Sequence, residues 1–172
     1  MNPNKWNEDD RINFSHAIPR RLTAEQMIDA VSIATGTKPN VQGLPDTMRA
    51  VYLADGLMEG NDFLKLFGRP KRESACECER TSNVSLAHAL NLINGPLISG
   101  TVIDPNNDIA KLVKTESDNR KVVDGIYYSM LSRPATDAEA AAVDLGAGEQ
   151  RLEVAQDLAW ALLNTPSFLF NR

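Results

Sequence analysis

The chain has 172 residues, of which 42% are hydrophobic and 24% are charged, and its formal net charge is -5. These proportions are typical of one soluble globular domain with a buried core, and they exclude an intrinsically disordered chain. The acidic balance argues against nucleic-acid binding, which needs a cationic surface. The longest apolar run, residues 158–163, is far shorter than the roughly 20 residues of a membrane span, so we expect no membrane insertion by this chain.

The first predicted helix begins after Thr23, whose hydroxyl can cap it while the side chain of Gln26 reaches back to form a capping box. Apolar residues then recur at helical spacing, and Gly36 supplies a stop. The residues expected to face the core are Met27, Ala30, Val31 and Ala34.

Two stretches, residues 37–61 and 68–84, are expected to be irregular. The first is interrupted by proline and glycine, and residues 50–54 within it fit either a short extended piece or one helical turn. Any sheet is therefore predicted to be no larger than a two-stranded piece within 37–61. Between the two stretches, Asn61 can cap a short helix that Gly68 and Pro70 close.

Helical spacing of apolar residues continues through the second half of the chain. Further helices are predicted at 85–93, from Pro96, near 109–113, after Ser117, from a second capping box at Thr136 to Gly146 or Gly148, and over 150–164. In the last helix, Leu158 and Leu162 are expected in the core. The apolar tail Phe168-Leu169-Phe170 is expected to pack back on the bundle. The sequence thus predicts one compact all-α domain of about seven helices over residues 1–172.

Both cysteines lie in the triplet Cys76-Glu77-Cys78. Residues two apart share a face only in an extended segment, so the two thiols can act together only if this segment is not helical. Three outcomes remain open: two inert buried thiols, a Cys76–Cys78 disulfide, or half of a metal site. A zinc site needs two further ligands, and neither His16 nor His88 has metal-ligand spacing to the cysteine pair.

The charged residues around the cysteine pair form a candidate interaction surface. They are Arg69, Lys71, Arg72, Glu77, Glu79 and Arg80. We expect an ordered, non-helical connection here, because Pro70 blocks a helix. The alternative is that these charges are solvated or paired with their neighbours, and that the segment is purely a structural connector.

Motifs of known catalytic chemistry are missing from the sequence. It has no Gly-x-Ser-x-Gly nucleophile elbow around Ser15 or any other serine, no phosphate loop, no His-Glu-x-x-His and no Cys-x-x-Cys-His haem attachment. The residues therefore predict no catalytic and no cofactor-binding position, and they favour a non-enzymatic role.

Blocks in order along nearly the whole chain resemble the planctomycete-type domain of unknown function 1553 family. The blocks are Asn13-Phe14-Ser15-His16-Ala17 with Pro19-Arg20-Arg21-Leu22-Thr23-Ala24-Glu25-Gln26, Phe67-Gly68-Arg69-Pro70, Cys76-Glu77-Cys78-Glu79-Arg80, Leu92-Ile93-Asn94-Gly95, Leu131-Ser132-Arg133-Pro134-Ala135-Thr136, Asp157-Leu158-Ala159-Trp160-Ala161-Leu162-Leu163-Asn164 and Phe168-Leu169-Phe170-Asn171.

This resemblance implies the C-terminal part of a long exported protein, often with a planctomycete-type cytochrome c domain upstream. We therefore expect an excised C-terminal fragment, located in the periplasm or at the cell surface even though residues 1–10 are no signal peptide. A Cys76–Cys78 disulfide fits that location. Any haem would belong to the absent upstream portion, and no cofactor is expected on this chain.

The resemblance brings no established activity or active site. We interpret the chain as an interaction or scaffolding module whose partners include the upstream domains of the same protein. One alternative is a redox or metal-binding accessory domain that uses Cys76 and Cys78 beside a cytochrome c domain. Another is part of a hydrolase or carbohydrate-processing assembly.

Overall fold

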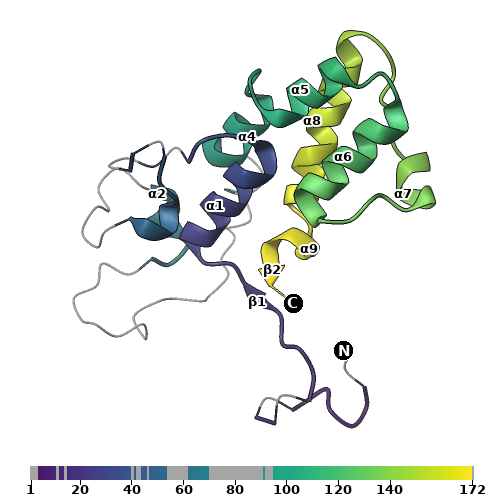
Figure 1. Ribbon diagram of the computed structural model, residues 1–172. Coiled ribbons are helices and arrows are strands. Elements are labelled where there is room, and N and C mark those ends of the chain that lie inside the picture. Colours follow the sequence, from purple (N-terminus) through teal and green to yellow (C-terminus); the bar gives the residue numbers. More distant parts are fainter. Residues whose placement is uncertain are drawn as a thin grey trace.

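The chain is mostly helical, as predicted (Figure 1). The computed structural model describes residues 4–10, 12–13, 15–39, 41, 44–45, 47–53, 62–69, 91 and 95–171. The helices are α1 (Ala24–Thr35), the 3-10 helix η1 (Ala50–Tyr52), α2 (Asp62–Leu66), α4 (Pro96–Ile103), α5 (Asp108–Thr115), α6 (Asn119–Leu131), α7 (Asp137–Ala141), α8 (Glu149–Leu163) and α9 (Pro166–Leu169). The strands are β1 (Arg20–Arg21) and β2 (Phe170–Asn171). No helix in these described ranges is long and apolar enough to cross a membrane.

Both predicted capping boxes form. At α1, the backbone N–H of Gln26 donates to the Thr23 hydroxyl, and the N–H of Thr23 donates to the Gln26 side chain. The second box starts α7 with Thr136 and Glu139. Each box satisfies backbone donors that a helix start otherwise leaves without partners. Gly36 ends α1 with a φ of 67°, in the left-handed region that glycine favours.

The predicted end of α7 at Gly146 or Gly148 is wrong, because the helix stops at Ala141. α7 buries none of its residues, so packing gives it little support. Leu145, by contrast, is only 1% exposed. The burial of this side chain explains why the chain leaves the helical path before the glycines.

The core lies where α6 and α8 pack together and where α1 and α4 join them. In Figure 1, α5, α6 and α8 form one side of the molecule, and α1, α2 and α4 form the other. Leu162 is buried, as predicted, whereas Leu158 is only partly buried against the core. The predicted helices at Pro96, near 109–113 and over 150–164 correspond to α4, α5 and α8.

The C-terminal end of the described chain pairs with the segment just before α1 in a short antiparallel pair. Arg20 lies opposite Asn171 and Arg21 opposite Phe170, and the N–H of Leu22 donates to the carbonyl of Leu169 at 3.1 Å. The tail therefore packs back, as predicted. The prediction that any two-stranded piece would lie within residues 37–61 is wrong, because the observed pair lies at residues 20–21 and 170–171. The described part of 37–61 includes the helical turn η1.

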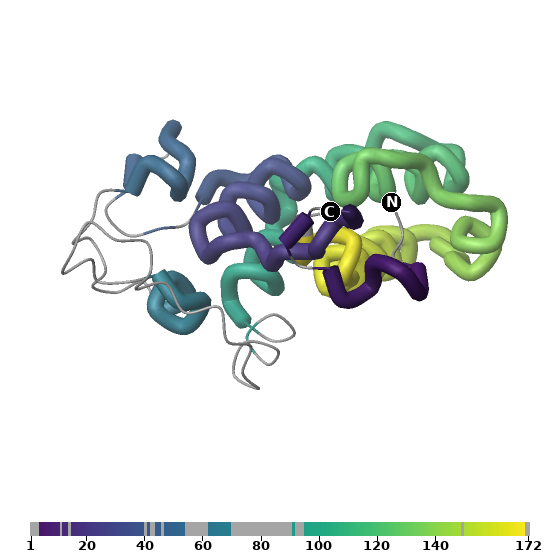
Figure 2. Tube along the Cα trace, turned by 90° about the horizontal axis from the view of Figure 1, so that it is seen from below, coloured from purple at the N-terminus to yellow at the C-terminus, as the bar shows by residue number. Residues whose placement is uncertain are grey.

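The described residues 4–10, 12–13 and 15–19, which we call the N-terminal arm, project from β1 away from the helices (Figure 1). Asp10 organises the arm by accepting hydrogen bonds from the Ser15 hydroxyl and from the N–H groups of Asn13 and Ile12. These bonds favour the charged carboxylate, so they hold the pKa of Asp10 well below its usual range. In Figure 2, which is seen from below, the arm lies in front of the side of the molecule that holds the C-terminal tail and away from α2.

Candidate functional site

Two of the sequence blocks that carry the family resemblance, around Arg21 and around Arg69, meet inside the molecule. The Nε atom of Arg69 lies 3.4 Å from Oε1 of Glu25, and the Nη2 atom of Arg69 donates to the carbonyl of Leu53 at 2.7 Å. The side chains of Arg69 and Glu25 are only 6% and 9% exposed. Removing one partner of such a buried pair would leave the other charge uncompensated.

The end of α2 positions Arg69. Gly68 has a φ of 82°, which reverses the chain, and the N–H of Arg69 then donates to the carbonyl of Leu64. Beside this turn, the rings of Phe63 and Phe67 stack with centroids 4.1 Å apart. The Arg21 guanidinium lies 5.5 Å from the Phe67 ring centroid, and burial lowers the pKa of Arg21.

One turn after Glu25, Asp29 continues the line of buried charge along α1. Its carboxylate accepts hydrogen bonds from the N–H of Ala50 at 2.6 Å and from that of Val51 at 3.2 Å. Asp29 thus caps η1 through a contact more than twenty residues away in sequence. We call Arg21, Glu25, Asp29 and Arg69 the charged seam. It fastens α1 to η1 and to α2.

The charged seam corrects part of the predicted interaction surface. Arg69 was expected on an exposed surface, but it is buried, because Glu25 and Leu53 bind its guanidinium inside the fold. The other predicted members, Lys71, Arg72, Glu77, Glu79 and Arg80, lie outside the described residues.

The metal and disulfide hypotheses also depend on residues beyond those described. Cys76, Cys78 and His88 fall outside the described ranges. His16 lies within them and is half-buried, and its Nδ1 atom is buried without a hydrogen-bond partner among the described residues. Within the described part of the chain, no three His, Cys, Asp or Glu side chains gather closely enough to hold a metal.

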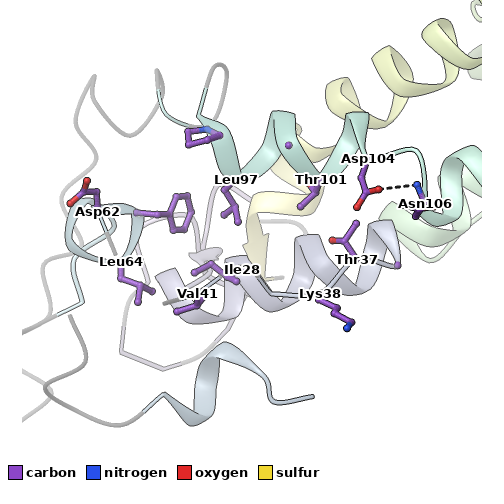
Figure 3. A pocket seen from close by; sticks show the side chains of 14 residues that line it. Ile28, Thr37, Lys38, Val41, Asp62, Leu64, Leu97, Thr101, Asp104 and Asn106 are labelled. Carbon is purple, nitrogen blue, oxygen red and sulfur yellow. Dashed lines mark hydrogen bonds between the residues drawn. The ribbon is translucent and has the colours of Figure 1, made fainter. Parts of the chain in front are cut away.

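Sequence reasoning missed a cleft of about 660 Å³ between α1, α2 and α4 (Figure 3). Its floor is apolar and comes from all three helices and from the loop after α1. The floor residues are Ile28, Val41, Phe63, Leu64 and Leu97. Polar side chains line the rest, with Asp62 at one end and Lys38, Thr101, Asp104 and Asn106 toward the other. We call this site the α1–α2–α4 cleft.

Gly100 lies in the middle of α4 and lines the cleft. A Cβ atom built on it would meet nothing within 4 Å. Packing therefore does not require a glycine here. A glycine in a helix also costs about 0.5–1 kcal/mol relative to alanine, so helix stability does not explain it either. The missing side chain leaves the α4 wall of the cleft open.

Comparison with known families decides where the chain belongs. The PSD1 family, described as "Protein of unknown function (DUF1553)", matches residues 2–145. The chain belongs to this family. The match extends from the N-terminal arm through the charged seam and every residue that lines the α1–α2–α4 cleft. No curated protein and no solved structure shows significant similarity to the chain.

Membership in the DUF1553 family agrees with the resemblance read from the sequence blocks, but the family description states no activity. A sequence signal for the cleft exists in retrospect. Gly100 interrupts the apolar run of α4 at a position where no turn or helix end needs a glycine.

Proposed function

We propose that this chain is an interaction module of a larger exported bacterial protein, located in the periplasm or at the cell surface. Its likeness to the C-terminal parts of long exported proteins, through the blocks around Arg21 and Arg69, supports that setting. The partner is a protein segment that binds in the α1–α2–α4 cleft.

The chemistry of the cleft carries this proposal. A volume of about 660 Å³ lies within the roughly 300–1,000 Å³ of small-molecule sites, which are mainly apolar with a few placed polar groups, so the cleft has room for a few side chains of a partner segment. The floor accepts aliphatic or aromatic side chains. The rim carries the carboxylates of Asp62, which also pairs with Lys65, and of Asp104, together with the ammonium of Lys38, and the carboxylates favour a cation. A segment with apolar side chains next to a lysine or arginine matches both features.

The charged seam supports the proposal from the structural side. Its ion pair and hydrogen bonds fix α1 against α2, and these two helices provide most of the apolar floor. A wall held in place before binding loses less conformational entropy when a partner arrives. The seam thus prepares the cleft without contacting the partner.

The test measures association of the purified chain with itself and with the upstream region of the longer protein, expressed as a separate polypeptide. Calorimetry reports binding to the upstream region, and sedimentation reports self-association. Gly100→Trp places an indole in the cleft, and we expect it to weaken at least one of these associations by at least about tenfold.

Ser129→Trp is the matched control, because it adds the same indole to an exposed position of α6, which does not line the cleft. Association lost with Gly100→Trp but kept with Ser129→Trp supports the proposal. The proposal is wrong if neither partner binds the parent chain, or if Gly100→Trp binds as tightly as the parent.

A further inference from the structure

The N-terminal arm presents two large apolar side chains to solvent. Trp6 is 84% exposed and Ile12 is 82% exposed, more than any other large hydrophobic residue among those described. Isolated exposed apolar residues are ordinary on protein surfaces. These two differ because they occur together on one short segment that projects from the body of the molecule (Figure 1).

The arm is nevertheless held in a defined local shape. The N–H of Asn4 donates to the Asn7 side chain at 2.7 Å, and the N–H of Trp6 donates to the Asn4 side chain at 2.9 Å. Asn7 also donates to the carbonyl of Ser15 at 3.1 Å, which ties the two halves of the arm together. Trp6 is therefore displayed on a folded segment, which lowers the entropy cost of binding a partner.

The arm also carries a cation next to its aromatic ring. The ammonium of Lys5 lies 4.7 Å from the Trp6 ring centroid. The indole and the aliphatic side chain match the apolar floor of the α1–α2–α4 cleft. The rim holds Lys38 as well as Asp62 and Asp104, and the arm holds Glu8 and Asp9 as well as Lys5, so both surfaces carry charges of both signs that can pair. None of the arm's described residues lines the cleft of its own chain.

We propose that the N-terminal arm of one copy docks in the α1–α2–α4 cleft of a second copy, with Trp6 and Ile12 on the apolar floor and Lys5 at the rim beside Asp62 or Asp104. This inference rests on the proposed function and names the partner as a second molecule of the same chain. Reciprocal exchange of two arms closes a twofold dimer, in which each chain gives one arm and receives one.

Sedimentation of the full chain over a range of concentrations tests this dimer. The parent is expected to dimerise, and Trp6→Ala or Ile12→Ser is expected to raise the dimer dissociation constant by at least about tenfold, as for a central apolar anchor. Tyr128→Ala, which removes another exposed aromatic from α6, is the control that should leave the dissociation constant unchanged.

Mixing two variants separates arm from cleft. Gly100→Trp blocks the cleft but keeps the arm, whereas Trp6→Ala weakens the arm but keeps the cleft, so each alone should be monomeric at concentrations where the mixture associates. The mixed dimer retains one intact contact, from the arm of Gly100→Trp to the cleft of Trp6→Ala. If circular dichroism shows that Gly100→Trp does not fold, Gly100→Gln serves in its place.

The inference is overturned if the parent stays monomeric, if Trp6→Ala dimerises like the parent, or if the mixture fails to associate. A monomeric parent whose cleft binds the upstream region would overturn the dimer alone and keep the proposed function. A chain that neither dimerises nor binds the upstream region would overturn both.

Discussion

At the residue scale, Glu139 shows how one side chain joins a helix cap to an ion pair. It accepts two hydrogen bonds from the Arg133 guanidinium, at 2.7 and 2.8 Å, and one from the N–H of Thr136. The Arg133 bonds first, and the Thr136 bond second, lower the pKa of Glu139 from its ordinary 4.5 to about 2. Between these values the unfolded chain binds more protons than the folded one.

Glu139 therefore stabilises the fold above a pH of about 4.5, and this contribution is lost as the pH falls toward about 2. We expect Glu139→Gln to melt at a lower temperature than the parent near neutral pH, and the two melting temperatures to converge on acidification. Arg133→Met should show the same convergence, because it removes the main cause of the lowered pKa. A difference that stays constant from neutral pH to pH 2 would contradict this account.

Burial separates two leucines that the sequence pattern alone treats alike. Leu162 is 6% exposed, whereas Leu158, one helical turn earlier in α8, is only partly buried. We expect Leu162→Ala to lower the free energy of unfolding by about 2–5 kcal/mol, as for other core leucines, and Leu158→Ala to cost clearly less. Denaturant titration of both variants measures the two losses. Equal losses would show that the exposed fraction of these two leucines does not predict how much each contributes to the free energy of unfolding.

At the scale of elements, the charged seam holds the end of α2 beside the buried side chains of Leu64 and Phe67. Arg69→Ala leaves Glu25 buried without its guanidinium, so we expect a loss of about 3–5 kcal/mol in the free energy of unfolding. The exposed pair of Lys65 with Asp62 on the same helix is the control. Lys65→Ala should cost less than about 1 kcal/mol.

A double variant isolates the cause of that loss. Arg69→Met with Glu25→Leu removes both charges together, so most of the stability lost in Arg69→Ala should return. Thermal and denaturant unfolding of the single and double variants provide the comparison. If the double variant is no more stable than Arg69→Ala, the loss comes from packing or from the bond to Leu53, and not from an unpaired carboxylate.

Local signals account for the elements that could be predicted from the sequence. A capping box needs only residues three positions apart, and Pro96 and Gly36 act on their own turns, so these features are readable without tertiary information. The end of α7 could not be predicted in this way, because it depends on the burial of Leu145 in the folded chain. Likewise, the pairing of β1 with β2 joins opposite ends of the chain, and no local pattern encodes such a partner.

Less of the candidate site than of the fold could be predicted from the sequence. Arg69 was predicted as part of an interaction surface, whereas it is buried, because nothing near it in sequence reveals the carboxylate of Glu25. The α1–α2–α4 cleft needs three helices in their packed positions before it exists. The one local sequence signal of the cleft is Gly100, which by itself indicates only a residue that weakens a helix.

At the scale of the whole molecule, the C-terminal tail fastens β1, from which the N-terminal arm projects. Phe168 is 9% exposed, and α9 packs against both α6 and α8. The same tail supplies β2 and the carbonyl of Leu169, which binds the N–H of Leu22. Loss of the Phe168 side chain should therefore loosen β2 and, through it, β1.

We expect Phe168→Ala to cost about 3–5 kcal/mol in the free energy of unfolding and to speed hydrogen exchange at the Leu22 amide. The Met27 amide, which donates to the carbonyl of Thr23 inside α1, is the internal reference. Because local opening of the tail does not break α1, exchange at Leu22 should rise more than exchange at Met27. If both amides accelerate equally, the variant acts only through global unfolding, and the tail is not a separate anchor for the arm.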